Sequence, residues 1–346
     1  MQKIKLLLLL LLLPTLIFSQ KKYFKNKFQH YQIIKKNDTI NFHIYGKESL
    51  QDKEGFVLYI QGSNVNPLYR SIQKTDTIRF ANTDSIHLKK YVEVHSSVPF
   101  KLKKTPKNYP LVLVSKKTLP FESSGLDSIV SKQFYERDGI NYRAWQNNEV
   151  INYMIKNLIK KPKKVMVIGH SEGSDVVAKL GTINKQITHI GFWSGGGNTQ
   201  FYDFALFIRK KVISGEITEK EGQEEMEQLF SEIKDIYKHP KSLEKQWLGH
   251  PYKKWVNATE PAINNLLQID IPIFVAIGAK DKAVPMESSL LIPIEFIRHQ
   301  KTNLTYKVYP NLDHSFIVVD ENKNMYEWES KWNEIFKTFL LWCDVK

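Results

Sequence analysis

Ser171 lies at the centre of a Gly-x-Ser-x-Gly pentapeptide, Gly169–Gly173, whose surroundings favour a nucleophilic role. The residues before it, Val165–Ile168, form an uninterrupted apolar run typical of a strand buried on both faces of a parallel sheet. Residues 174–180 carry apolar side chains at helical spacing. A sharp turn between strand and helix would hold the hydroxyl clear of the sheet, and the two glycines would remove the collisions at that turn. A chance match to the motif is the alternative, and the flanking patterns argue against it.

Two later loops could supply the groups that activate a serine. Asp281 follows the apolar run Ile271–Ile277, and a carboxylate just past a strand is well placed to orient a histidine. His314 follows the predicted strand Leu304–Tyr309.

Competing candidates fit less well. His170 would point away from the serine hydroxyl, and His299 lies in a helix-like stretch. Asp313 is the sequence neighbour of His314 and is poorly placed to reach its ring, while Asp270 precedes its strand and would lie at the opposite end of the sheet.

The backbone N–H of Glu172 would begin the helix that follows the serine. At that position the helix dipole favours a developing negative charge. We therefore expect this N–H group to bind an oxyanion.

Strand and helix patterns alternate along most of the chain. A hairpin is predicted over Tyr31–Gly46, and buried strands over Phe56–Ile60, Leu111–Val114 and Ile187–Trp193. Helices are predicted over Trp145–Ile159 and Tyr326–Trp342, with a loop over Ser124–Asn141 and a polar excursion over Asn66–Asn108. This rhythm predicts an α/β fold, a three-layer α/β/α sandwich around a mostly parallel sheet.

Residues 198–267 interrupt the rhythm with helical patterns and no confident strand. We expect these residues to form a helical cap inserted into a catalytic domain that spans 21–346, because they lie where the hydrolases that these motifs resemble carry a cap; a second structural domain is the alternative. The three glycines before the insertion, Gly195–Gly197, suggest a flexible hinge, because no phosphate-binding pattern follows them.

The N-terminus predicts export. Residues 1–20 combine Lys3 and Lys5 with a short apolar run and a small residue suited to cleavage, which indicates a signal peptide. The run is short for a membrane span, so no stable membrane anchor is expected after cleavage. Cys343 is the single cysteine and excludes an intramolecular disulfide.

Composition indicates a globular protein of 346 residues, with 42% hydrophobic and 25% charged residues. Its net charge of +14 comes from lysines scattered through every segment, which indicates general surface charge. No nucleic-acid partner is expected, because no recognised binding module accompanies the charge. The histidines are dispersed, so no metal site is predicted, and no cofactor is expected.

Together these motifs resemble a serine hydrolase of the α/β-hydrolase superfamily, nearest to exported esterases allied to the prolyl-oligopeptidase and dienelactone-hydrolase-like branches. The resemblance rests on G-H-S-E-G at 169–173, G-x-x-D-x-x-V-P at 278–285 and D-H-S-F at 313–316. They occur in the order Ser, Asp, His that this fold requires. The resemblance implies that Ser171 is the nucleophile, that His314 is the general base and that Asp281 is the carboxylate that orients His314.

The same resemblance implies a second oxyanion donor in the loop after Phe56–Ile60. Gln61 stands where the family usually has histidine, but Gly62-Ser63 keeps the small turn, so the N–H of Ser63 is the candidate; an ordinary surface turn would look the same.

The predicted function is hydrolysis of carboxylic esters with small or medium acyl groups, or of acylated glycans, with a small-molecule ester as the partner. A serine peptidase, an acyltransferase and a non-catalytic hydrolase-like binding module are the alternatives. The sequence leaves the oligomeric state open.

Overall fold

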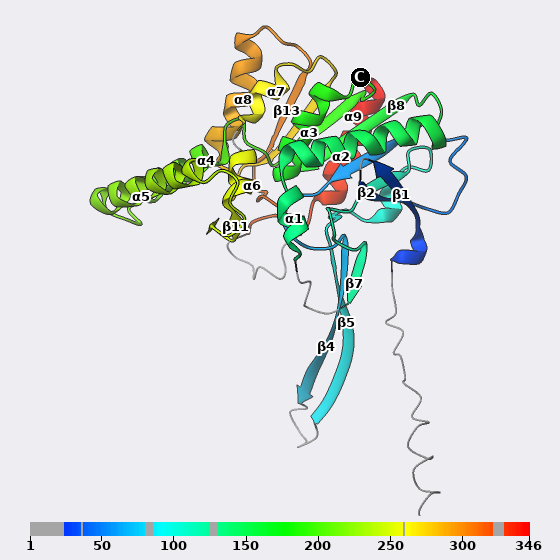
Figure 1. The fold of residues 1–346 in the computed structure, drawn as a ribbon, viewed down its shortest axis with the longest axis horizontal. Coiled ribbons are helices and arrows are strands. Elements are labelled where there is room, and N and C mark those ends of the chain that lie inside the picture. Colours follow the sequence, from blue (N-terminus) through cyan, green and yellow to red (C-terminus); the bar gives the residue numbers. More distant parts are fainter. Residues whose placement is uncertain (1–23, 36, 80–85, 125–129, 259, 321–328) are drawn as a thin grey trace, which may run out of the picture.

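The computed structural model describes residues 24–346, except 36, 80–85, 125–129, 259 and 321–328. The predicted signal peptide, residues 1–20, lies outside these residues. An eight-stranded sheet forms the centre of the molecule, in the order β1-β2-β6-β3-β8-β9-β12-β13 (Figure 1). Its strands are β1 Phe28–Lys35, β2 Asp38–Tyr45, β3 Gly55–Ile60, β6 Leu111–Val114, β8 Lys164–His170, β9 His189–Trp193, β12 Ile273–Gly278 and β13 Leu304–Tyr309.

One strand of this sheet runs against the others. β2 pairs antiparallel with both β1 and β6, and the remaining neighbours pair in parallel. The loops that follow β3, β8, β12 and β13 therefore leave the sheet at the same edge. Ligand sites of open parallel sheets occupy this edge.

Helices cover both faces of the sheet, which gives the predicted three-layer α/β/α sandwich. One face packs against α2 (Ile140–Tyr153), α3 (Glu172–Ile183), α7 (Ala262–Leu266) and α8 (Met286–Arg298). The other face packs against α9 (Trp332–Val345). A five-residue π-helical segment, Met154–Leu158, continues α2.

The alternation of side chains along the central strands produces these two cores. In β8, Val165 and Val167 join the core under α2 and α3, while Met166 and Ile168 join the core under α9. Every residue of β3 is buried. Strands that are covered on both faces have continuous apolar sequences, and for this reason they could be predicted from the sequence.

Residues 66–108 contain more structure than the predicted polar excursion. β4 (Tyr69–Arg79) and β5 (Ile86–Ser96) form a long antiparallel hairpin that projects from the body of the molecule (Figure 1). β7 (Glu122–Ser124) adds a third, parallel strand at its base, where the ring of Tyr69 stacks on Phe24 with centroids 4.1 Å apart. The strands are rich in charged and polar residues, so their apolar alternation is weak in the sequence.

The insertion, residues 198–267, is mostly helical. It contains α4 (Gln200–Ile213), α5 (Glu219–Lys238), α6 (Tyr252–Asn257) and α7, together with a two-residue hairpin of β10 (Gln246–Trp247) and β11 (His250–Pro251) that the sequence did not predict. A capping box of Thr218 and Glu221 begins α5. Phe201, Phe204, Trp247 and Trp255 pack together with ring centroids 4.9–6.1 Å apart.

Two predicted boundaries are wrong. The segment 124–141, predicted as a loop, contains α1 (Lys132–Arg137), which is capped by the Ser131 side chain. The last helix begins at Trp332 and not at Tyr326, since Glu329 and Ser330 are not helical; residues 326–328 lie outside the described part. Boundaries of this kind depend on capping contacts that periodicity does not reveal.

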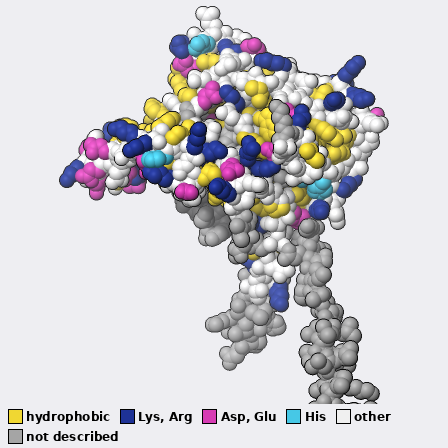
Figure 2. All heavy atoms as spheres, viewed as in Figure 1, with side chains coloured by type: hydrophobic (Ala, Val, Ile, Leu, Met, Phe, Trp, Pro, Cys, Tyr) yellow, Lys and Arg dark blue, Asp and Glu magenta, His cyan; other side chains and the backbone are white. Residues whose placement is uncertain are grey.

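The surface agrees with the predicted distribution of charge. On the face shown in Figure 2, Lys and Arg side chains are scattered among acidic ones and do not form a single basic patch. Within the described residues, no helix combines the length and the apolar character that a membrane span requires.

Candidate active site

Ser171 occupies a strained turn between β8 and α3. Its backbone lies at φ 56° and ψ −132°, a conformation that non-glycine residues rarely adopt. A Cβ atom at Gly169 would come within 2.0 Å of the Gly173 carbonyl oxygen, and one at Gly173 within 2.2 Å of the Ile60 carbonyl oxygen. The two glycines are therefore required because helix, turn and strand meet backbone to backbone, as the sequence predicted.

Asp281 and His314 are joined by a hydrogen bond of 2.8 Å between Oδ2 of the aspartate and Nδ1 of the histidine. The aspartate is buried, and its Oδ1 accepts hydrogen bonds from the backbone N–H groups of Ala283 (2.7 Å) and Val284 (2.8 Å). Fixing both carboxylate oxygens holds the imidazole with Nδ1 as the donor, which leaves Nε2 free to act as a base.

His170, one of the rejected candidates, supports the loop that carries His314. The His314 carbonyl accepts hydrogen bonds from Nε2 of His170 (2.8 Å) and Oγ of Ser194 (2.9 Å). Burial lowers the pKa of His170 to about 3, with His314 adding to the effect, so this ring stays neutral. His170 therefore acts as a hydrogen-bond donor to the carbonyl of His314.

Asp313 also has a structural role. Its Oδ1 accepts hydrogen bonds from the backbone N–H groups of Ser315 and Ile317, each at 2.9 Å. These bonds close the turn that presents His314. Asp270 instead pairs with Lys301 at the protein surface.

A cavity of about 200 Å³ brings the predicted site residues together. Ser171 and His314 line it, as do both residues whose N–H groups were predicted as oxyanion donors, Glu172 and Ser63. Gly62 lies directly against Ser171, since a Cβ atom there would be 3.1 Å from that of the serine. The loop after β3 therefore closely approaches the serine.

One face of α4 forms the wall of this cavity opposite the sheet. Its lining residues Gln200, Asp203, Phe204 and Phe207 recur at spacings of three and four, which is one side of a helix. Burial raises the pKa of Asp203 to about 7, with the charge of Asp281 adding to the effect. The insertion thus contributes both aromatic and carboxyl groups to the space beside Ser171.

The triple glycine before the insertion is a packing device, and the prediction of a flexible hinge is wrong. All three glycines are buried. A Cβ atom at Gly195 would lie 2.1 Å from Oγ of Ser174, and one at Gly196 would lie 2.4 Å from Oγ of Ser288. Glycine is needed here because the chain passes between α3 and α8 at close range.

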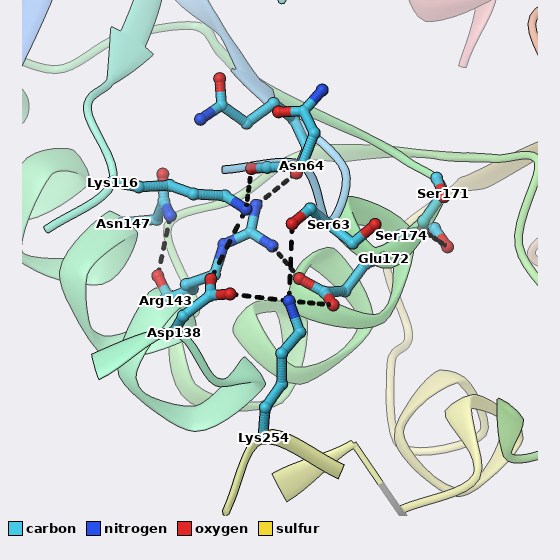
Figure 3. A network of polar contacts seen from close by, with 11 residues as sticks. Ser63, Asn64, Lys116, Asp138, Arg143, Asn147, Ser171, Glu172, Ser174 and Lys254 are labelled. Carbon is cyan, nitrogen blue, oxygen red and sulfur yellow. Dashed lines mark hydrogen bonds and ion pairs between the residues drawn. The ribbon is translucent and has the colours of Figure 1, made fainter. Parts of the chain in front are cut away.

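Sequence reasoning missed a set of buried charged residues close to Ser171. We call this set the ion cluster (Figure 3); its members are Lys116, Asp138, Arg143, Glu172 and Lys254. Arg143 could have been noticed, because it shares a face of α2 with the buried residues Asn147 and Val150. Lys254 gives no such signal, because the residues next to it in the sequence do not indicate that it pairs with Asp138 and Glu172.

These features define the class of the molecule. An eight-stranded sheet with only its second strand reversed, a strained serine between β8 and α3, and an aspartate and histidine after the last two strands are the parts of the α/β-hydrolase fold. The chain therefore has the α/β-hydrolase fold.

A comparison with protein families agrees with this fold over part of the chain. The sequence model of the dienelactone hydrolase family matches residues 245–341, which include Asp281 and His314, and supports hydrolase activity. No curated protein matches the sequence.

Several solved structures resemble the chain. An esterase from Pyrococcus furiosus aligns with 92% of this chain and 93% of its own, at 16% identity and a TM-score of 0.49. Est1E from Butyrivibrio proteoclasticus aligns with 92% of this chain and 99% of its own, at 13% identity and a TM-score of 0.48. Acylaminoacyl peptidase from Pyrococcus horikoshii aligns over 95% of this chain but 42% of its own, at 12% identity and a TM-score of 0.49.

Proposed function

We propose that the protein is an exported serine hydrolase that cleaves carboxylic esters through an acyl-enzyme. One observation carries the proposal: the strained Ser171 and His314 line one cavity, and the buried Asp281 is hydrogen-bonded to His314 behind it. Strain at a nucleophile persists only where the surrounding structure enforces it, and such strain is concentrated at functional sites.

The proposed reaction has two halves. Ser171 Oγ attacks the ester carbonyl while Nε2 of His314 takes its proton, and the oxyanion that forms accepts hydrogen bonds from the N–H groups of Glu172 and Ser63. The tetrahedral intermediate collapses, the C–O bond to the alcohol breaks, and His314 returns the proton to the departing alkoxide oxygen. Water then attacks the acyl-enzyme by the same route and releases the acid.

The size of the cavity supports a small or medium acyl group, since about 200 Å³ is below the usual range for drug-sized ligands. Phe204 and Phe207 offer apolar contact to that group. Export is supported by the composition of residues 1–20.

Covalent labelling of Ser171 tests the proposal. A fluorophosphonate probe should label the wild-type protein at Ser171, and Ser171→Ala should lose both the label and the hydrolysis of p-nitrophenyl acetate. We expect kcat to fall by roughly three to six orders of magnitude with folding intact. Ester turnover that survives in a folded Ser171→Ala variant would refute the assignment, and cleavage of peptides in preference to esters would refute the substrate class.

A further inference from the structure

The ion cluster is fully enclosed by the protein. Each of its members, Lys116, Asp138, Arg143, Glu172 and Lys254, is more than nine-tenths buried. Burying charges is costly, and a well-packed apolar cluster of the same volume is often as stable or more stable. Its stability therefore does not account for its presence beside Ser171.

The cations of the cluster hold the loop after β3 by its carbonyl oxygens (Figure 3). Nη2 of Arg143 donates to the carbonyl of Gln61, and Nζ of Lys116 donates to that of Asn64 at 2.8 Å. Between them, Nζ of Lys254 lies 3.5 Å from the carbonyl of Ser63. These three contacts, to Gln61, Ser63 and Asn64, hold the backbone on both sides of Gly62 and so restrain the N–H of Ser63.

The same cations hold the residue after the nucleophile. The Glu172 carboxylate lies 2.6 Å from Arg143 and 3.0 Å from Lys254. Burial opposes its charge, but Lys254 and Arg143 outweigh that effect and lower the pKa of Glu172 below its ordinary value. Glu172 is therefore ionised and tied to the cations that hold the loop, while its backbone N–H begins α3.

Lys254 links these parts to the insertion. It lies in α6, and its Nζ is 2.7 Å from Asp138 as well as 3.0 Å from Glu172. Burial opposes its charge, but the two carboxylates outweigh that effect and raise the pKa of Lys254. One ammonium group from the insertion thus joins α3, the loop after β3 and the segment before α2.

We propose that the ion cluster positions the two oxyanion donors relative to each other, and that Lys254 makes the insertion a part of the oxyanion hole. Lys254 is a positioning residue in this scheme, because it acts through Ser63 and Glu172 and not on the substrate. The inference rests on the proposed function and adds to it that the insertion stabilises the transition state as well as covering the cavity.

Replacement of Lys254 by methionine tests the inference, because methionine is unbranched and only one atom shorter than lysine, and it removes the charge. We expect kcat for p-nitrophenyl acetate to fall about 10- to 100-fold, with KM changing less than about threefold, since loss of a whole oxyanion donor costs about 10²–10³. A matched thionoester should lose less, because sulfur accepts hydrogen bonds weakly. The ratio of the ester rate to the thionoester rate should therefore fall in Lys254→Met.

Two further variants separate positioning from stability. Leu229→Ala removes buried apolar volume from α5 of the same insertion, outside the group of Ile236, Tyr252 and Trp255 that packs on α6, and should lower stability while leaving the rate ratio at the wild-type value. Asp138→Asn keeps the shape of the side chain and weakens its hold on Lys254, so it should lower the ratio by a smaller amount and serves if Lys254→Met fails to fold.

Amide hydrogen exchange keeps the inference testable without ester turnover. The peptide that contains residues 61–64 should exchange at least about tenfold faster in Lys254→Met and at the wild-type rate in Leu229→Ala. Unchanged exchange and an unchanged rate ratio would overturn the inference while leaving the esterase proposal intact. Absence of Ser171-dependent turnover in the wild type would instead refute the proposed function, and the exchange rates would still decide whether Lys254 holds the loop.

Discussion

Gly173→Ala is the substitution whose effect the structure defines most sharply. The added Cβ atom would lie 2.2 Å from the Ile60 carbonyl oxygen and 2.9 Å from that of Gln61. Both are backbone atoms at the end of β3, which is paired on both sides in the middle of the sheet and cannot give way. The start of α3 must therefore move by about 1 Å to restore a normal carbon–oxygen contact.

The expected cost follows from two opposing effects. Alanine in place of glycine favours a helix by about 0.5–1 kcal/mol. Overpacking of a rigid interior costs about 1–3 kcal/mol, and the upper end applies because no side chain can rotate away. We expect a net loss of about 2 kcal/mol in the free energy of unfolding. A shift of about 1 Å between Ser171 and the loop after β3 should also lower kcat about 100-fold.

Gly181→Ala provides the matched control, because it adds the same atom to the same helix. Its Cβ would lie 2.6 Å from Cδ1 of Ile269 and 2.8 Å from Cδ1 of Ile190, the ends of flexible side chains. Urea unfolding and p-nitrophenyl acetate hydrolysis measure both variants. We expect Gly181→Ala to keep kcat within about threefold of wild type. A Gly173→Ala variant with wild-type kcat would refute the steric account of the serine turn.

Two further perturbations test the hydrogen-bonded pair Asp281–His314 and a buried histidine. Asp281→Asn keeps the shape of the side chain but no longer holds Nδ1 of His314 as a donor, so kcat should fall about 10³- to 10⁴-fold with unchanged unfolding; a loss below tenfold would argue against the pair. Burial lowers the pKa of His43 from its ordinary value of 6.5 to about 3, with His30 adding to the effect. Below pH 6.5 the unfolded chain therefore binds a proton at His43 that the folded chain does not bind. The free energy of unfolding falls as the pH decreases, by about 2 kcal/mol at pH 5. His43→Gln should remove that part of the loss in urea unfolding at pH 7, 6 and 5, and an unchanged pH dependence would contradict it.

The local sequence was sufficient for the strands and for the turn that carries Ser171. Buried parallel strands are continuous apolar runs, and the steric needs of the serine turn leave a fixed pattern of glycines. Both are properties of a few neighbouring residues. For that reason β3, β6, β8, β12 and β13 lie within two residues of where the apolar runs predicted them.

Other features depended on contacts that short-range patterns do not contain. The β4–β5 hairpin has a weak alternation because its strands stabilise each other away from the main core. The triple glycine suggested mobility, yet Gly195 and Gly196 are needed for close packing against Ser174 and Ser288. The sequence showed that Gly195 and Gly196 have no side chains, but it did not show that Ser174 and Ser288 fill the space beside them.

The sequence by itself determined which reactive side chains the protein has and which elements carry them: a serine in a strained turn, and an aspartate and a histidine in loops after later strands. Tertiary structure alone decided the surroundings of that chemistry. Lys254 meets Asp138 and Glu172 across separations of 116 and 82 positions, and no local pattern encodes such a meeting. Buried charges are stable only when the fold brings their partners to them, so these contacts exist only in the folded chain.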